Sequence, residues 1–480
     1  MSTRPILPES AYEALGLSPE TIHVLMNPKP IYEPPEIAAP NLLNSDEENA
    51  RPMLPDETSI TLYAELLLNI RTVTLFASLR TNFSRETHAK LSANGSCITV
   101  SHEGSHATIR LPVNVKGGGD ADLSLPSIPP NKEITLRLQI EELENSDLLG
   151  ALNSEERQQN IVPWNGSYLE QLGDVEVICK NCREPMVLQG KIKEWRDLPN
   201  ENWAEMMDFW HCHKPDEHHL HDNTHEEAIG QKGYAAGSRL QASQGIGFVD
   251  LSSILLKEQD CDGVRLPSKQ SSETKALVCQ YCAEPVGTRD EAADGWRLQK
   301  WSIGMRSSSS PNLPVSYSPA KWISARLLYL IENSGIRKFH IHPAQNNSAS
   351  ALSALPGPKE PVPSLLVWVF TPDLLFSSSI PSPNRLDPTR SVKVFYQKQT
   401  WQPLQPGEPE NASIEDLEFP QDLYTELQEA LIASQRLLPP TAKKFQGWDV
   451  ALLDRFDLAD VGRTYTTNND THGLESEDVD

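Results

Sequence analysis

Hydrophobic and polar residues alternate along residues 57–160. The clearest run spans residues 134–140, where every second residue is Ile or Leu and the residues between them are polar. A period of two is typical of a strand with one buried face. Similar alternation on both sides of Glu103-Gly104-Ser105 predicts a hairpin that turns at these residues. We therefore expect an N-terminal antiparallel β-sandwich over residues 57–160.

Residues 315–460 combine helical and extended patterns. A hydrophobic stripe with helical spacing follows Ser318-Pro319 and stops at Gly335, which predicts a helix with an N-cap serine, a proline in its first turn and a glycine at its end. The hydrophobic run 365–370 predicts a buried strand, and a second helix is expected over residues 421–438. These patterns indicate a mixed α/β C-terminal region.

The two ends of the chain differ in composition from the parts between them. Residues 1–56 contain repeated prolines and an acidic patch, which predict a Pro-rich disordered arm. Residues 463–480 are polar and acidic, and we expect a disordered tail. With residues 161–300 as a middle region, the chain is expected to have an α+β fold.

Charge narrows the classes of function. The chain has 480 residues, with 42 Lys and Arg against 66 Asp and Glu, and a formal net charge of −24. An acidic surface repels phosphate backbones and anionic lipids, so we expect no direct nucleic-acid partner and no membrane partner. No hydrophobic run reaches the roughly 18 residues that span a bilayer. The first residues lack a signal-peptide pattern, and seven cysteines without an export signal do not predict a disulfide framework. We expect the protein in the cytoplasm, the nucleus or both.

Two segments about one hundred residues apart read almost alike. Each has a hydrophobic strand end, a Cys-x-x-Cys turn and then Glu-Pro. Such a turn places two sulfur atoms on one side, and two turns complete a tetrahedral set of four thiolates. The alternative is that one or both pairs are buried or redox-active cysteines. The duplication favours a structural zinc ion that joins the two cysteine segments within residues 161–300. Its ligands would be Cys179, Cys182, Cys279 and Cys282.

A tryptophan-rich segment lies between the two cysteine pairs. Trp203 and Trp210 belong to a hydrophobic stripe with helical spacing, which indicates either core packing or a partner-binding face. Cys212 follows between His211 and His213. Because Pro215 ends the helix by about Lys214, Cys212 is expected in the last helical turn, where the helix dipole disfavours a thiolate. Protonated neighbouring histidines would offset that effect.

These residues resemble the HECT-like family of proteins that bind ubiquitin-conjugating enzymes. The resemblance rests on the two Cys-x-x-Cys turns, on the Leu-Pro-x-Glu-Asn-Trp…Trp-His-Cys-His segment at residues 198–213 and on the C-terminal motif at residues 438–456. It covers roughly residues 57–460. It implies a ubiquitin ligase that accepts ubiquitin from a conjugating enzyme, with ubiquitin and a protein client as further partners. Fungal relatives are also linked to the endonuclease of messenger-RNA cleavage and polyadenylation.

One feature departs from the HECT pattern. A HECT ligase carries its thioester cysteine near the C-terminal end, whereas this chain has no cysteine after Cys282. If ubiquitin is carried covalently outside the zinc ligands, the thiol is Cys97, Cys212 or Cys261. Cys97 lies in a predicted strand, and the charges of the Asp-Cys-Asp-Gly loop are expected to raise the pKa of the Cys261 thiol. Cys212 is therefore the best candidate nucleophile, with His211 or His213 as the adjacent base. Zinc ligation or support of the site is the alternative role of Cys212 and His213.

Two functions therefore remain open. The first is a ubiquitin ligase that forms a thioester or positions a charged conjugating enzyme. The second is a non-catalytic, zinc-stapled scaffold that stabilises a client such as the polyadenylation endonuclease. The missing C-terminal cysteine favours the scaffold, and the family resemblance favours the ligase.

Overall fold

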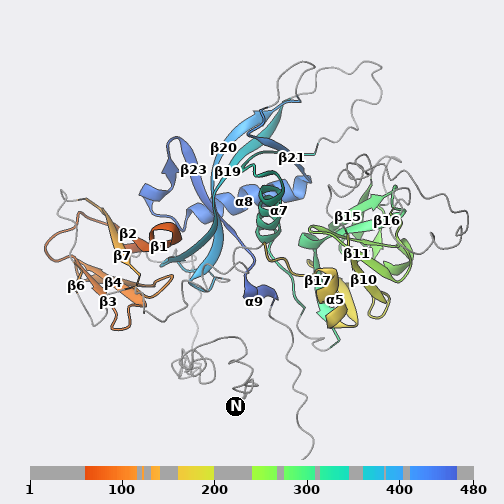
Figure 1. The fold of residues 1–480 in the computed structure, drawn as a ribbon, viewed down its shortest axis with the longest axis horizontal. Coiled ribbons are helices and arrows are strands. Elements are labelled where there is room, and N and C mark those ends of the chain that lie inside the picture. Colours follow the sequence, from red (N-terminus) through yellow and green to blue (C-terminus); the bar gives the residue numbers. More distant parts are fainter. Residues whose placement is uncertain are drawn as a thin grey trace, which may run out of the picture. The chain divides into compact units, whose positions relative to one another are not determined.

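The computed structural model describes ten stretches of the chain (Figure 1). They are residues 60–115, 122–123, 131–140, 160–198, 240–267, 275–308, 314–344, 361–382, 385–403 and 411–461. Within them the protein is mostly β, with few helices, and its sheets are largely antiparallel. The expected arm at 1–56, the tail at 463–480 and the segment 203–213 lie outside these residues. No helix in the described stretches has both the length and the hydrophobicity needed to cross a membrane.

The largest sheet joins the N-terminal strands to the C-terminal ones. In the described residues it has nine strands. Its order is β22 (Lys444–Phe445), β23 (Trp448–Asp454), β20 (Thr389–Trp401), β19 (Val362–Ser378), β1 (Ile60–Leu67), β2 (Thr72–Leu79) and β7 (Glu133–Gln139). Beside this path, β18 (Lys338–Pro343) pairs with β19, and β21 (Glu415–Phe419) pairs with β18 in parallel. The pair β1–β19 connects segments more than 300 residues apart, for example at Tyr63 and Ser378.

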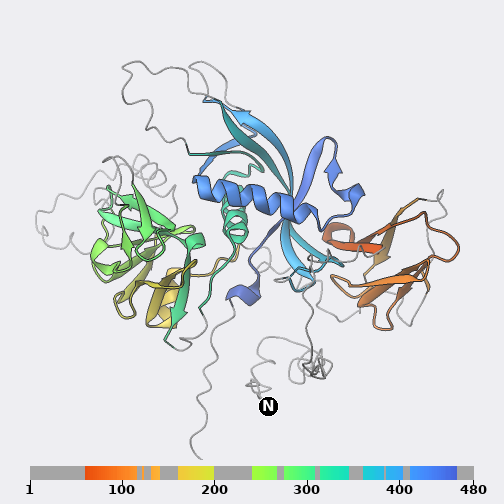
Figure 2. The same ribbon diagram turned by 180° about the vertical axis from the view of Figure 1, so that it is seen from behind.

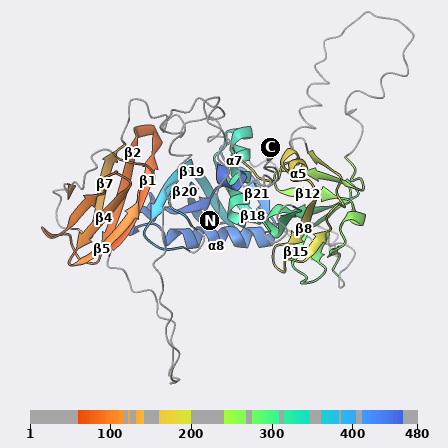
Figure 3. The same cartoon turned by 90° about the horizontal axis from the view of Figure 1, so that it is seen from below.

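A four-stranded sheet lies next to β1 and β2 (Figure 3). Its order is β5 (Ser105–Arg110), β4 (Cys97–His102), β3 (His88–Leu91) and β6 (Asp122–Leu123). The predicted hairpin turns at Glu103 and Gly104, which both have positive φ (48° and 80°), as a tight β4–β5 connection requires. The alternating hydrophobic residues of both sheets share one core, which includes Leu75, Ile98 and Leu136.

Two helices cover one face of the nine-stranded sheet. Helix α7 (Pro319–Ser334) begins with the predicted proline and ends at Gly335 (φ 73°), although the hydroxyl of Ser318 makes no capping hydrogen bond. Helix α8 (Gln421–Gln435) runs across the sheet (Figure 2). It ends three residues earlier than predicted, because residues 436–438 continue as tight turns. The other helices in the described stretches are α5 (Gly166–Leu172) and α9 (Leu458–Val461), with short 3-10 turns at Leu68–Ile70, Glu258–Asp260, Lys300–Ser302 and Pro440–Ala442.

The middle of the chain forms two further sheets. The seven-stranded sheet has the order β10 (Glu194–Asp197), β11 (Ile246–Val249), β12 (Ser253–Leu256), β16 (Gly295–Gln299), β15 (Pro285–Asp290), β14 (Ala276–Cys279) and β13 (Val264–Arg265). The three-stranded sheet has the order β17 (Ile303–Ser307), β8 (Val175–Cys179) and β9 (Pro185–Val187). One hydrophobic core extends from these sheets to α7, α8 and the helix-facing side of β18, β19 and β20.

A candidate four-cysteine metal centre

The two Cys-x-x-Cys segments fold into the same turn. In the first, β8 ends at Cys179, whose N–H donates to the carbonyl of Glu184 over 2.9 Å. In the second, β14 ends at Cys279, whose N–H donates to the carbonyl of Glu284, also over 2.9 Å. The residue after each second cysteine, Arg183 or Ala283, has a φ of 64° or 61°. The repeated sequence thus produces a repeated backbone, and each turn presents both of its sulfurs to one side.

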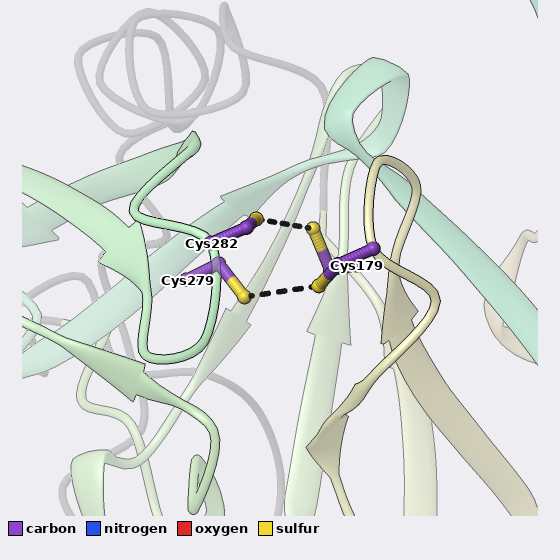
Figure 4. A group of neighbouring side chains, drawn as sticks. Cys179, Cys279 and Cys282 are labelled. Atoms are coloured by element: carbon purple, nitrogen blue, oxygen red, sulfur yellow. Dashed lines mark hydrogen bonds between the residues drawn. The ribbon is translucent and has the colours of Figure 1, made fainter.

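The four sulfur atoms meet between the two turns. Figure 4 shows the side chains of Cys179, Cys279 and Cys282 pointing toward one another. The sulfurs of Cys179 and Cys282 are 3.7 Å apart, those of Cys182 and Cys279 are 3.6 Å apart, and all four lie within 4.8 Å of one another. A regular tetrahedron with ion–sulfur distances of about 2.3 Å has edges of about 3.8 Å. The four predicted cysteines therefore form a group that fits a tetrahedral metal ion.

The thiols differ in how readily they ionise. Burial raises the pKa of the Cys179 thiol above its ordinary value, although the N–H groups of Cys182 and Asn181 oppose this effect. Burial opposes ionisation of Cys282, but the N–H of Glu284 and the neighbouring thiols lower its pKa to about 7. Four adjacent thiolates repel one another, and a bound dication would remove that repulsion.

A short loop holds the two turns together. The N–H of Gly263 donates to the carbonyl of Met186, which follows the first turn, over 3.0 Å. The carbonyl of Gly263 accepts from the N–H of Gln280, inside the second turn, over 2.8 Å. A Cβ atom at this position would lie 2.1 Å from the carbonyl oxygen of Pro185, so the contact requires glycine. Gly263 therefore fixes the spacing of the two cysteine pairs.

The first turn is also tied to the C-terminal region. The ammonium group of Lys180, between the two cysteines, donates to the carbonyls of Tyr317 (2.8 Å) and Trp301 (3.3 Å). The indole N–H of Trp301 in turn donates to Asp422 in α8 over 3.4 Å. The candidate metal centre thus lies beside the contacts that join the middle sheets to the helices.

The other described cysteines, Cys97 and Cys261, lie outside the four-cysteine group. Cys261 is buried, and its pKa is raised by burial first and then by the carboxylates of Asp260 and Asp262, the effect predicted for its acidic loop. Cys97 begins β4, as predicted, and its sulfur contacts the hydroxyl of Ser96. The remaining site residues predicted from the sequence lie outside the described residues; they are Cys212, His211, His213, Trp203 and Trp210.

Sequence reasoning missed Gly263 and Lys180. The signal at Gly263 is its place in the Asp-Cys-Asp-Gly loop, where a glycine after three polar or small residues indicates only a turn. Lys180 differs from its counterpart Gln280 in the repeat, and this asymmetry is the one visible sign that the first turn has an additional contact.

Comparisons of the sequence with known proteins found one family and two relatives. The family model described as HECT-like ubiquitin-conjugating enzyme (E2)-binding matches residues 65–450. An uncharacterized protein of Saccharomyces cerevisiae is 23% identical over 296 residues, which cover 60% of this chain and 71% of that protein. An uncharacterized protein of Schizosaccharomyces pombe is 24% identical over 307 residues, covering 62% of this chain and 78% of that protein. No solved structure matches.

Proposed function

The chain belongs to the HECT-like ubiquitin-conjugating enzyme (E2)-binding family, and we propose that it binds a ubiquitin-conjugating enzyme and promotes ubiquitin transfer to a protein client. The observation that carries this proposal is the extent of the family match. Residues 65–450 include parts of every sheet described above and both cysteine pairs. The name of the family describes binding of the conjugating enzyme, and the transfer step is our extension of it.

The metal that we propose for the four-cysteine centre is zinc. Four thiolate ligands in a tetrahedral arrangement favour zinc or an iron–sulfur site, and two Cys-x-x-Cys turns are a common ligand set of structural zinc. Four protein ligands leave no open position for a substrate. We therefore assign the ion a structural role, in which it joins β8–β9 to β14–β15.

The route of transfer depends on Cys212. In this proposal the metal occupies four of the thiols, those of Cys179, Cys182, Cys279 and Cys282. Burial raises the pKa of a fifth thiol, that of Cys261. Cys212, with His211 or His213 as the base, is the thiol that we propose for a covalent ubiquitin intermediate. Trp203 and Trp210, in the same segment, are the residues that we propose to contact the conjugating enzyme.

A second candidate function is a non-catalytic scaffold that stabilises a client, such as the polyadenylation endonuclease. It is favoured by one observation, which is that the sequence has no cysteine after Cys282, where a HECT ligase carries its thioester cysteine. A scaffold would use the conjugating enzyme or the client as a binding partner without accelerating transfer.

A thioester assay separates the two functions. Zinc-loaded protein is mixed with a ubiquitin-charged conjugating enzyme and analysed on a non-reducing gel, with wild type beside Cys212→Ala. We expect a ubiquitin adduct that thiol reductant removes and that Cys212→Ala lacks. Cys97→Ser is the matched control and should keep the adduct.

Discharge of the conjugating enzyme is measured in the same reactions. Faster discharge without an adduct would contradict the covalent route and leave a ligase that positions the charged enzyme. Discharge no faster than that of the conjugating enzyme alone, with no adduct, would reject ubiquitin transfer and favour the scaffold.

A further inference from the structure

Strand β7 is an open edge of the nine-stranded sheet. It pairs with β2 on one side, and among the described residues no strand pairs with its other side (Figure 3). An isolated bridge between Val115 and Ile140 lies one residue past the end of β7. Leu136 in β7 keeps 7% exposure, whereas its partner Leu75 in β2 keeps 0%. This difference is expected for a strand that has a neighbour on one side only.

The backbone of β7 directs half of its polar groups to this open side. The N–H of Leu79 donates to the carbonyl of Lys132 over 2.8 Å, and the N–H of Ile140 donates to the carbonyl of Arg71 over 3.4 Å. Because bonded pairs recur at every second residue of an antiparallel ladder, the even-numbered residues of β7 bond to β2. The N–H and C=O groups that point outward belong to Glu133, Thr135, Arg137 and Gln139.

One outward N–H has a contact within its own loop. The N–H of Glu133 donates to the side-chain oxygen of Asn131 over 3.5 Å, which is at the long limit for a hydrogen bond. Unpaired backbone groups along a sheet edge are a template for a further strand. The edge of β7 can therefore accept a strand over Glu133–Gln139.

The side chains on one face of β7 carry both signs of charge. Because side chains alternate along a strand, Glu133, Thr135 and Arg137 lie on the face away from the core that contains Leu136. The hydroxyl of Ser78, on the same face of β2, donates to Oε1 of Glu133 over 2.7 Å. The other oxygen of Glu133, Oε2, is buried and accepts no hydrogen bond from the described residues. Arg137 is exposed.

We propose that β7 pairs with the β7 of a second copy of this chain, antiparallel and across a two-fold axis. The register places Thr135 opposite the partner's Thr135, so that Glu133 lies opposite the partner's Arg137, and Arg137 opposite the partner's Glu133. Directly opposite side chains have Cβ atoms about 4.5–5.5 Å apart, a distance at which both ion pairs form. The guanidinium group would also supply a donor to Oε2 of Glu133, which lacks one.

The backbone supports the same register. Thr135 and its symmetry mate form a bonded pair at the two-fold axis, and Glu133 forms a bonded pair with the partner's Arg137. On the core face, Ile134 lies opposite the partner's Leu136, so the two hydrophobic cores become neighbours across the axis. This association is separate from the cysteine centre and does not depend on the proposed ligase function.

Charge selects both the register and the edge. A shift of the partner by four residues places Glu133 opposite its own mate in one direction and Arg137 opposite its own mate in the other. Like charges directly opposite one another destabilise a strand pair. A shift by two residues leaves both charges without an opposite charge across the axis. At another edge of the sheet, β21 carries Glu415, Asp416 and Glu418, where a second copy would meet only like charge.

Sedimentation equilibrium of the full-length, zinc-loaded protein tests the proposal. One pair of strands makes an interface below the roughly 1,200 Å² of stable complexes, so we expect a reversible dimer between about 1 and 200 µM. Arg137→Glu makes both ion pairs repulsive and should weaken dimerisation at least about tenfold. Lys398→Glu makes the same change of charge at an exposed position of β20 and should leave dimerisation unchanged.

A mixing experiment tests the register. Glu133→Arg should also weaken self-association, because it places Arg residues opposite one another in both pairs. An equimolar mixture of Glu133→Arg and Arg137→Glu should dimerise again, since each charge then meets its opposite. The melting temperature of each variant checks that it is folded. Two folded variants that do not associate when mixed would overturn the register and with it the proposal.

A backbone variant tests the edge independently of charge. Thr135→Pro removes an outward N–H at a position of an edge strand where proline is tolerated, and it should weaken dimerisation at least about tenfold. Thr135→Val keeps the N–H and should dimerise like the wild type. A dimer that Thr135→Pro leaves unchanged would place the interface elsewhere and overturn the proposal. Wild-type protein that is monomeric at every concentration would leave the edge to a strand of another protein, and it would equally overturn pairing with a second copy.

Discussion

Gly263 shows how much a single residue determines at the candidate metal centre. Replacement by alanine would place a methyl group 2.1 Å from the carbonyl oxygen of Pro185 and 2.8 Å from the Cα of Met186. Both contacts are with backbone, which cannot rotate away. We expect Gly263→Ala to separate the two turns and to lower the free energy of unfolding by about 2–4 kcal/mol. Chemical denaturation with the zinc content measured in parallel checks this.

Asp262→Ala is the matched control in the same loop. It removes an ion pair with Lys191 whose side chains are 42% and 35% exposed. An exposed pair of this kind contributes about 0–1 kcal/mol. A Gly263→Ala variant as stable as Asp262→Ala, with a full equivalent of zinc, would show that the close approach at Gly263 is not required.

Lys300 is a fully buried amine whose charge opposes folding. Its ammonium group donates to the carbonyl of Trp164 over 3.0 Å and lies 5.4 Å from the ring of Trp322. Burial lowers the pKa of Lys300 from 10.5 to about 7, against the weaker effect of Asp250 and Asp197. At a pH between these two pKa values, Lys300 is protonated in the unfolded chain and deprotonated in the folded chain.

Stability should therefore rise with pH in that window. Because the unfolded state binds more protons, the contribution of Lys300 increases by up to about 1.4 kcal/mol per pH unit between pH 7 and pH 10, and it is flat below about pH 7. Lys300→Met removes the titration. We expect the wild type to gain stability relative to Lys300→Met as the pH is raised, measured by denaturation of zinc-loaded protein. A difference independent of pH would mean that Lys300 stays protonated in the fold.

At the scale of elements, the two cysteine turns should depend on the metal. Release of a structural zinc costs on the order of 10 kcal/mol, whereas a whole domain is stable by about 5–15 kcal/mol. We expect Cys179→Ser or Cys279→Ser to lose both the zinc and the soluble fold. Metal content and thermal melting of the purified variants measure this directly.

Cys97→Ser serves as the control for the cysteine variants. It changes a thiol in β4, whose residues Ile98 and Val100 belong to a different hydrophobic cluster from the metal centre. It should keep one equivalent of zinc and a nearly unchanged melting temperature. If Cys179→Ser also kept one equivalent with unchanged melting, the four cysteines would not act as a metal staple.

Local patterns in the sequence predicted individual elements well. The Glu103-Gly104 turn, the proline at the start of α7, the glycine after it and the hydrophobic run inside β19 all depend on neighbouring residues. The repeated Cys-x-x-Cys-x-Glu-Pro sequence predicted that four distant cysteines come together, and they do. These features are visible because the responsible residues lie within a few positions of one another.

Pairings between distant strands could not be read from the sequence. The strand β1 was expected within a separate N-terminal sandwich, yet it pairs with β19 as well as β2. Alternation of hydrophobic residues indicates which face of a strand is buried, but it does not indicate which strand lies beside it in the sheet. The same limit concealed the contact of Lys180 with Tyr317, which joins segments 137 residues apart.

At the scale of the molecule, the middle sheets and the C-terminal helices share one core. Cys179, Leu277 and Trp301 belong to the same cluster of buried residues as Leu327 of α7 and Leu427 of α8. The rings of Trp164, Tyr317, Trp322 and Phe456 fill the junction between them. We expect a shared core of this kind to unfold as one cooperative unit, so damage at the cysteine centre should reach the helices.

Hydrogen exchange after metal removal tests this coupling. Because Lys180 and Trp301 connect the first cysteine turn to Tyr317 and α8, we expect chelation of the zinc to reduce amide protection in α7 and α8 as well as in β8 and β14. Protection in β3–β5, whose hydrophobic residues form a different cluster, should change less. Loss of protection confined to residues 160–308 would show that the shared core is divided energetically at the junction. The zinc would then stabilise the middle sheets alone, and the C-terminal helices would fold independently of it.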